Sequence, residues 1–350
     1  MLMYGRRDWR ETGFMEMLLK ATRAAVWFWL GLLFALMAIP AGAQAVTSEI
    51  KPQLVWVDTD IGDDIDDAFA LGLILRSPEL KVVGISTAFG DTAMRARILD
   101  RFLAATGGKL NLTSAGVRTE TDNPMTQRAY GEKWPVGKVP DGVAAMLEAI
   151  RAHPGELTLI AIGPLFNIGA AIDRDPVTFR KLKRVVMMGG SIEHGYSGGQ
   201  GAPKPPEPEW NIKQDPKGAA KLFGSGVPIF MAPLDSTQIP LEAAERDALF
   251  ATGNPLTDQL TLLYYQWMAH SWNHAPTPTL FDPVAAAYTF RPDLCPMTPM
   301  RIEVDPSGLT RRVDGQPNVE VCLKSDEAAF LQLLLSRLQM SDKETFMLVK

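Results

Sequence analysis

The sequence predicts an α/β protein whose largely parallel, Rossmann-like sheet is flanked by helices. From residue 53 onward, short and nearly continuous apolar segments alternate with segments of helical pattern. Strands that are apolar throughout are typical of a parallel sheet covered by helices on both faces. No internal repeat or long low-complexity linker divides this part of the chain, so we expect one domain over residues 46–350.

Five strands and five helices are expected in alternation. The strands are short apolar runs bounded by turn residues: Gln53–Val57, Lys81–Thr87, Leu157–Ile162, Arg184–Met188 and Val227–Ala232. The helical patterns between them are Asp66–Arg76, Thr92–Thr106, Asp141–Ala152, Leu165–Ile172 and Pro216–Phe223. The glycine- and proline-rich stretch Gly195–Pro208 predicts a surface loop.

The first 45 residues differ in kind from the rest. Lys20 and Arg23 precede the apolar stretch Ala24–Ala38, and an Ala-x-Ala sequence ends at Ala45. This pattern predicts a secretory signal peptide over residues 1–45, cleaved after Ala45. The alternative is a transmembrane anchor, which needs about 20 apolar residues. We therefore expect a periplasmic or secreted protein without a stable membrane anchor, and the net charge of −5 provides no basic surface for nucleic acid.

Two cysteines remain in the exported chain, Cys295 and Cys322, on either side of an expected hairpin. An oxidising compartment permits a disulfide between them. The sequence does not give their Cα distance, so a bridge and two separate buried cysteines both stay open.

The most unusual feature is an acidic run: six of the ten residues from Asp58 to Asp67 are aspartates. An apolar strand precedes the run and an apolar helix follows it, so the carboxylates are held at a strand-to-helix turn. One helix cap needs only one or two carboxylates. Carboxylate oxygens suit hard cations such as Ca²⁺ and Mg²⁺, and the run therefore predicts a metal site.

The ends of the other expected strands support a site at the same edge of the sheet. Gly163-Pro164, Gly189-Gly190 and Leu234-Asp235 each follow a strand. Ligands of open α/β sheets bind beyond the carboxyl ends of the strands.

Two further acidic segments complete a pattern. Glu209-Trp210-Asn211 follows the loop, and Phe281-Asp282-Pro283 opens a helical segment. In this order the chain resembles the inosine–uridine preferring nucleoside hydrolase family, and the resemblance spans nearly all of the exported chain. The matching segments are DTDIGDDIDDAFAL, VVGISTAFGDT, AIGPLFNI, VVMMGG, EWNIKQDP and FDPVAAAY. The resemblance implies a nucleoside-hydrolase-like fold, a homodimer or homotetramer, and Ca²⁺-dependent hydrolysis of ribonucleosides to free base and ribose.

The resemblance also implies a role for each matching residue. Asp60, Asp67, Asp282 and the carbonyl of Ile162 would hold Ca²⁺, and Asp60 would deprotonate the calcium-bound water. The substrate would be held by Asp66, Asp91, Met188, Glu209 and Asn211. Asp58 matches an aspartate that lies behind the metal ligands. These residue types suit the reaction, because anionic groups stabilise the ribosyl cation that forms as the bond breaks.

Three departures from the family pattern stand out. The acidic turn is two residues longer, adding Asp63 and Asp64. The alternative register would put Ile65 in a ligand position, so we keep Asp66 and Asp67. Asp91 stands where many members have asparagine. Phe281 stands where many members have a histidine that protonates the departing base, and phenylalanine cannot donate a proton.

Aromatic residues upstream of Phe281 are candidates to hold the base by stacking, and His270 and His274 lie among them. These aromatics are Tyr264, Tyr265, Trp267 and Trp272. Equally, a helix can bury such side chains in the core.

Two other functions compete with nucleoside hydrolysis. An exported nucleoside-binding protein that has lost catalysis is favoured by Phe281 and disfavoured by the retained acidic residues. A haloacid-dehalogenase-like phosphatase also has an Asp-x-Asp after its first strand. It would need a later lysine and a late Asp-Asp pair, whereas here Asp66-Asp67 follows at once.

Overall fold

The computed structural model describes residues 51–341, except residues 109, 124, 136, 198–203 and 271–275. The expected signal peptide, Trp272 and His274 lie outside the described residues. From residue 51 onward the chain forms one compact unit. Within the described ranges, every helix is too short or too polar to cross a bilayer.

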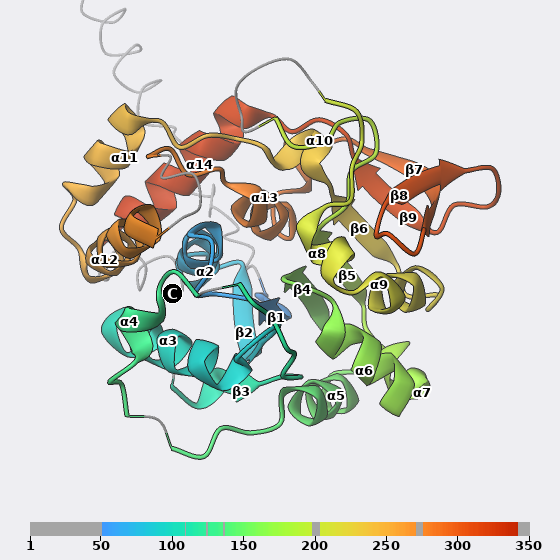
Figure 1. Ribbon diagram of the computed structural model, residues 1–350, viewed down its shortest axis with the longest axis horizontal. Helices are drawn as coiled ribbons and strands as arrows, with labels where there is room; N and C mark the ends of the chain where they lie inside the picture. The colour runs from blue at the N-terminus through green and yellow to red at the C-terminus, as the bar shows by residue number, and fades with distance from the viewer. Residues whose placement is uncertain are drawn as a thin grey trace, which may run out of the picture. The chain divides into compact units, whose positions relative to one another are not determined.

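A nine-stranded sheet runs through the centre of the described part of the chain (Figure 1). Its order is β3-β2-β1-β4-β5-β6-β9-β7-β8. Every pair from β3 to β9 is parallel, whereas β7 is antiparallel to both β9 and β8. The strands are β1 (Gln53–Thr59), β2 (Leu80–Thr87), β3 (Thr113–Ala115), β4 (Thr158–Ile162), β5 (Arg184–Met188), β6 (Ile229–Ala232), β7 (Met297–Val304), β8 (Thr310–Val313) and β9 (Val319–Cys322).

All five predicted strands are present, with ends within two residues of those expected. The sequence did not predict β3, which has only three residues and lies at an edge. Nor did it define β7, β8 and β9, which together mix buried, half-buried and exposed positions. Their period differs from that of the fully buried parallel strands.

Helices cover both faces of the sheet, as the strand composition predicts. Val55 and Val57 face one core cluster, and Trp56 between them faces the other, because successive strand residues point to opposite faces. The first face is covered by α2 (Asp66–Leu75), α3 (Thr92–Ala105), α12 (Pro255–His270), α13 (Phe281–Tyr288) and α14 (Glu327–Gln339). The second is covered by α5 (Gly142–Ala152), α6 (Phe166–Arg174), α7 (Pro176–Phe179) and α9 (Pro216–Phe223). The five predicted helices are confirmed within two residues.

Short helices make up the remaining connections. They are α4 (Arg128–Gly131), α8 (Trp210–Gln214), α10 (Leu234–Thr237) and α11 (Ala243–Phe250), with single 3₁₀ turns η1 (Leu110–Leu112) and η2 (Pro292–Leu294).

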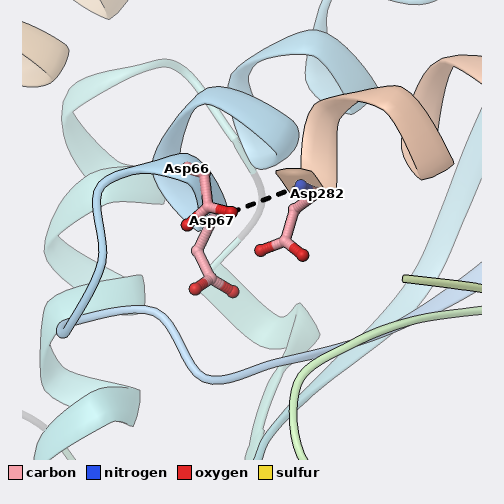
Figure 2. A group of neighbouring side chains, drawn as sticks. All are labelled: Asp66, Asp67 and Asp282. Atoms are coloured by element: carbon pink, nitrogen blue, oxygen red, sulfur yellow. Dashed lines mark hydrogen bonds between the residues drawn. The ribbon is translucent and has the colours of Figure 1, made fainter. Parts of the chain in front are cut away.

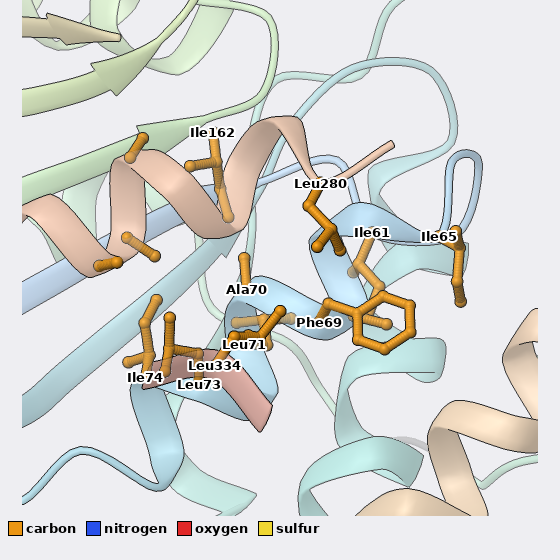
Figure 3. Packing of buried hydrophobic residues seen from close by; sticks show 14 of the residues in the cluster. Ile61, Ile65, Phe69, Ala70, Leu71, Leu73, Ile74, Ile162, Leu280 and Leu334 are labelled. Carbon is orange, nitrogen blue, oxygen red and sulfur yellow. The ribbon is translucent and has the colours of Figure 1, made fainter. Parts of the chain in front are cut away.

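Helix α2 is the most deeply buried helix of the site, and this placement determines the environment of the acidic run. Its residues from Asp66 to Ile74 are all buried. Phe69, Leu71 and Ile74 lie in one apolar cluster with Ile162, Leu280 and Leu334 (Figure 3). A helix that is apolar all round is stable only in the interior. Its first two residues, both aspartates, are therefore drawn into the protein.

The two cysteines form a disulfide, with their Cα atoms 5.8 Å apart. The pairing of β7 with β9 brings them together, because Met297 lies opposite Cys322 in the register. Of the two arrangements that the sequence left open, the structure has the bridge.

Candidate active site

Three carboxylates converge where α2 and α13 begin (Figure 2). Asp66 and Asp67 open α2, and Asp282 is the second residue of α13. One oxygen from each carboxylate lies within 4.8 Å of the others. The backbone N–H of Asp282 donates a hydrogen bond to Asp66 Oδ2 at 3.3 Å, which links the two helix ends. This acidic cluster could hold a metal ion.

The helix ends favour negative charge at this place. The residues that precede α2 and α13, Ile65 and Leu280, have no side chain able to cap the helix. The carboxylates of the aspartates therefore interact with the first-turn N–H groups and with the positive ends of both helix dipoles.

Burial and mutual repulsion oppose this stabilisation. Burial, with the neighbouring carboxylates, raises the pKa of Asp66, Asp67 and Asp282 well above the usual range. Burial likewise raises the pKa of Asp60 to about 7, although Arg95 lowers it. A hard cation among these oxygens would remove the repulsion, so the donor set fits a divalent metal with oxygen ligands.

Asp60 lies at the end of β1, beside the end of β4. Thr59 is the sheet partner of Ile162, so the ends of β1 and β4 lie side by side at the edge of the sheet where the sequence predicts the site. A Cβ on Gly163 would lie 2.8 Å from Asp60 Oδ1, so only glycine leaves room for this carboxylate. The Thr59 hydroxyl donates a hydrogen bond to Asp67 Oδ1 and orients it.

Asp58 lies beneath the cluster and joins three elements. It is fully buried and accepts hydrogen bonds from the Ser86 hydroxyl on β2 and from Asn167 Nδ2 on α6, the latter at 2.7 Å. Burial raises the pKa of Asp58 to about 6. Asn167 also donates to the Thr87 carbonyl at 3.1 Å. The sequence did not single out Asn167, although it is the asparagine of the matching segment AIGPLFNI.

The remaining substrate candidates gather at the start of α8. Glu209 accepts hydrogen bonds from the N–H groups of Asn211 and Gly190, each at 2.9 Å. Asn211 Nδ2 donates to the carbonyl of Met188 at 3.3 Å, so Met188, Glu209 and Asn211 lie together. Burial raises the pKa of Glu209 to about 7.

Asp91 stands apart from these groups. It caps α3 by accepting from the Met94 N–H at 3.2 Å, and it lies 3.8 Å from Arg128. Within the described chain, Asp91 therefore contacts the N-terminus of α3 and Arg128, and not the carboxylate cluster.

The two extra turn residues are accommodated by separate contacts. Asp63 forms an ion pair with the buried Arg95 at 3.2 Å. Removal from water raises the pKa of Asp64 to about 6, and the Trp267 side chain of α12 lies close enough to oppose part of this rise. Ile65 belongs to the apolar core (Figure 3), which agrees with keeping Asp66 and Asp67 as the pair at the site.

The aromatics upstream of Phe281 divide between core and surface. The Tyr264 hydroxyl donates to the Pro276 carbonyl at 2.7 Å, and its ring is buried. Tyr265 is 57% exposed. His270 is exposed, and its Nδ1 lies 2.8 Å from the Gln266 carbonyl. Of the described members of this group, Trp267 is the one that reaches the acidic turn.

Sequence reasoning missed two aromatic residues beside the site. Tyr196 packs edge-on against Phe281, with ring centroids 6.1 Å apart. Phe89 has a positive φ of 64°, and its ring meets Trp210 at 5.8 Å. A non-glycine residue in this conformation is strained, and such strain concentrates at functional sites. No sequence pattern identifies either residue, because both contacts join segments far apart in the chain.

Fold and site together define an α/β enzyme with an acidic centre at the carboxyl edge of its sheet. Comparison with known proteins names the class. The model of the inosine-uridine preferring nucleoside hydrolase family matches residues 55–332. The chain therefore belongs to the inosine-uridine preferring nucleoside hydrolase family, whose members hydrolyse ribonucleosides to base and ribose. This membership excludes the haloacid-dehalogenase-like alternative.

Individual relatives are similar over most of their length. The pyrimidine-specific ribonucleoside hydrolase RihA of Citrobacter koseri is 29% identical over 314 residues, covering 81% of this chain and 97% of the relative. The probable uridine nucleosidase 2 of Arabidopsis thaliana is 27% identical, covering 82% and 98%.

Solved structures agree in fold. A plant nucleoside hydrolase superposes with a TM-score of 0.71 at 24% identity, covering 82% of this chain and 99% of the other. A purine-preferring ribonucleoside hydrolase from Gardnerella vaginalis gives a TM-score of 0.69 at 22% identity, covering 82% and 98%.

Proposed function

We propose that the chain hydrolyses the N-glycosidic bond of ribonucleosides with a bound Ca²⁺ and with Asp60 as the general base. The observation that carries this proposal is the buried cluster of Asp66, Asp67 and Asp282 at two converging helix ends. Its oxygen-only donor set fits Ca²⁺. In this proposal Asp60, Asp67, Asp282 and the Ile162 carbonyl hold the ion.

Asp66 has two candidate roles. The family resemblance assigns it to the ribose hydroxyls, whereas one of its carboxylate oxygens lies within 4.8 Å of oxygens of Asp67 and Asp282. Asp66 therefore stands where the sugar and the ion would meet, and it serves to align the two.

Each of the other site residues has a separate role in the proposed reaction. When bound, the calcium ion orients a water molecule and lowers its pKa. Asp60 takes the proton of the attacking water, and a base that titrates near neutral pH suits this role. Glu209, Asn211 and Met188 hold the sugar from the side of α8. The surrounding carboxylates stabilise the positive charge that develops on the ribosyl group.

Departure of the base is the step that Phe281 cannot assist. General acid assistance contributes roughly 10²–10⁴-fold in rate. Without it, uracil should leave slowly, and stacking on aromatic rings would favour the larger purines. The relatives include a pyrimidine-specific and a purine-preferring enzyme by name, so the base preference is decided by experiment.

A reducing-sugar assay tests the function. Purified protein is treated with chelator, reloaded with calcium, and assayed on inosine, uridine and p-nitrophenyl riboside, whose leaving group needs no proton. We expect ribose release that depends on calcium and is fastest with the nitrophenyl substrate. Stoichiometric nucleoside binding without ribose release from any of the three would instead establish the binding-protein alternative.

We also propose that the chain is exported and acts as a homodimer or homotetramer in the periplasm or outside the cell. The Cys295–Cys322 disulfide supports export, because such bridges persist in oxidising compartments. The assembly state rests on the family resemblance, and light scattering of the purified protein tests it.

A further inference from the structure

Tyr196 connects the two helices that carry the candidate site. Its ring meets that of Phe281, the first residue of α13, at 6.1 Å and an interplanar angle of 81°. Its hydroxyl oxygen accepts a hydrogen bond from the N–H of Trp210, the first residue of α8, at 2.9 Å. Phe281 immediately precedes Asp282, and Trp210 lies between Glu209 and Asn211. The phenol therefore lies between the acidic cluster and the residues that hold the sugar.

The segment that carries Tyr196 is anchored at several points. The Tyr196 N–H donates to Glu207 Oε1 at 2.9 Å. Gln238 Nε2 donates to the Gly195 carbonyl at 3.0 Å. Four residues before Tyr196, the Ile192 N–H donates to Asp235 Oδ2 at 2.9 Å, and one residue after it the Ser197 N–H donates to Gln238 Oε1 at 2.6 Å. Hydrogen bonds therefore hold the backbone before and after Tyr196.

The proton of this hydroxyl is available to a ligand. A phenol has one O–H donor in addition to its acceptor lone pairs. Trp210 uses the oxygen as an acceptor, and no other residue in the described ranges accepts the Tyr196 proton. Burial, and next the Glu209 carboxylate, raise the pKa of Tyr196. The hydroxyl therefore stays protonated at neutral pH.

We propose that the Tyr196 hydroxyl donates a hydrogen bond to the departing nucleobase and supplies the leaving-group assistance that Phe281 cannot. This assignment rests on the proposed function. As the bond between C1′ and the base nitrogen breaks, its electron pair passes to the base. The Tyr196 O–H stabilises that charge at an acceptor atom of the base, without transferring its proton. The water oxygen bonds to C1′, its proton passes to Asp60, and solvent protonates the free base.

The test compares Tyr196→Phe with the wild type on uridine, inosine and p-nitrophenyl riboside, using purified calcium-loaded protein. Phenylalanine keeps the ring contact with Phe281 and removes only the donor. Tyr130→Phe is the matched control, because it removes a buried hydroxyl that donates to Gln259 Oε1 at 2.7 Å, away from the site residues. We expect Tyr196→Phe to lower kcat on uridine and inosine by about 10- to 100-fold, the value of one hydrogen bond to a developing charge. The rate on p-nitrophenyl riboside should change by less than about 2-fold, since that leaving group needs no donor.

The ratio of the uridine rate to the nitrophenyl rate is the decisive quantity. It is independent of how much variant protein is folded, because the same folded fraction turns over both substrates. An unchanged ratio, whether all rates fall together or none falls, would overturn the role of Tyr196 and leave it a structural contact. A wild type that releases no ribose from any substrate would overturn the proposed function first, so the two failures are distinguishable.

Discussion

The aspartates between residues 58 and 67 share a side chain but not an environment. Asp58 bonds to Ser86 and Asn167 beneath the site. Asp63 pairs with Arg95, and Asp67 faces Asp282. The same residue type therefore serves as a buried hydrogen-bond acceptor, an ion-pair partner and a candidate metal ligand, depending on which strand or helix end it contacts.

Replacing a single carboxylate of the cluster should abolish turnover. Asp60→Asn and Asp67→Asn each remove one charge from the proposed metal shell, and Asp60→Asn also removes the base. We expect a loss of about 10³-fold or more in kcat, which the reducing-sugar assay measures. Asp305→Asn is the control, because Asp305 serves a turn at the β7–β8 hairpin through Ser307. Near-wild-type rates in the Asp60 or Asp67 variant, with calcium still bound, would refute the mechanism.

At the scale of elements, α3 holds the acidic turn through one residue. Arg95 is 2% exposed, and its Nε donates to the Phe89 carbonyl at 2.8 Å. It also bonds to the carbonyls of Asp60 and Ile61 and pairs with Asp63. The longer turn is thus closed by a buried cation from a neighbouring helix.

We expect Arg95→Met to lower the free energy of unfolding by about 3–5 kcal/mol. Removing one partner of a buried pair leaves the other charge uncompensated. Chemical denaturation measures the change. Arg174→Met is the matched control, because its ion pair with Asp141 is half exposed on both sides and is worth at most about 1 kcal/mol. Equal losses in the two variants would show that the buried pair has no special role.

The buried carboxylates of Asp60, directly after β1, and of Glu209, at the start of α8, should make the metal-free protein sensitive to pH. Burial raises the pKa of Asp60 from 3.8 to about 7 and that of Glu209 from 4.5 to about 7. The folded state therefore binds more protons than the unfolded state between these values. Stability is then fully present below about pH 4 and is lost as the pH rises toward 7.

Calcium should reverse this trend, because it binds the ionised folded cluster and not the unfolded chain. Melting temperatures across this pH range, with chelator and with excess calcium, measure both effects. We expect the calcium-dependent gain to grow toward neutral pH, and Glu209→Gln to flatten part of the slope in chelator. A melting temperature that is the same with chelator and calcium at neutral pH would argue against the metal.

At the scale of the whole molecule, the disulfide links Cys295, the residue after η2, to the last residue of β9 at the antiparallel end of the sheet. The bridge closes a loop with a sequence separation of 27 residues. In the chain-entropy model such a loop contributes about 3.5 kcal/mol. We expect a reductant to lower the free energy of unfolding by about this amount. The double variant Cys295→Ala/Cys322→Ala should not respond to the reductant. If the reductant lowered the free energy of unfolding of the double variant by the same amount, the effect would not be due to the disulfide.

Export predicts a particular mature protein. Cleavage after Ala45 leaves Val46 as the first residue. Intact-mass measurement of protein recovered from the periplasm should give the mass of residues 46–350. A recovered chain that retains Ala24–Ala38 would indicate a membrane anchor instead.

The fold was predictable where the sequence has a strong period. The five central strands are largely apolar, as expected of parallel strands that are buried on both faces. The edge strand β3 and the meander of β7 to β9 were not defined, since a three-residue strand shows no period and half-exposed strands mix polar with apolar side chains. The ordering of β9 beside β6 depends on contacts across the chain that no local pattern encodes.

The sequence by itself determined the α/β class, the place of the acidic run between a strand and a helix, and the family. The class and the place of the acidic run follow from composition and periodicity along the chain, and the family follows from the resemblance of its motifs to those of known members. Only the tertiary structure decided which aspartates meet. Asp282 lies more than two hundred residues from Asp67, and it joins the cluster because α2 and α13 pack together in one core. The same holds for the pairing of Arg95 with Asp63 and for Tyr196 against Phe281. Each contact joins residues far apart in sequence, and the packing of apolar faces, rather than any motif, sets such distances.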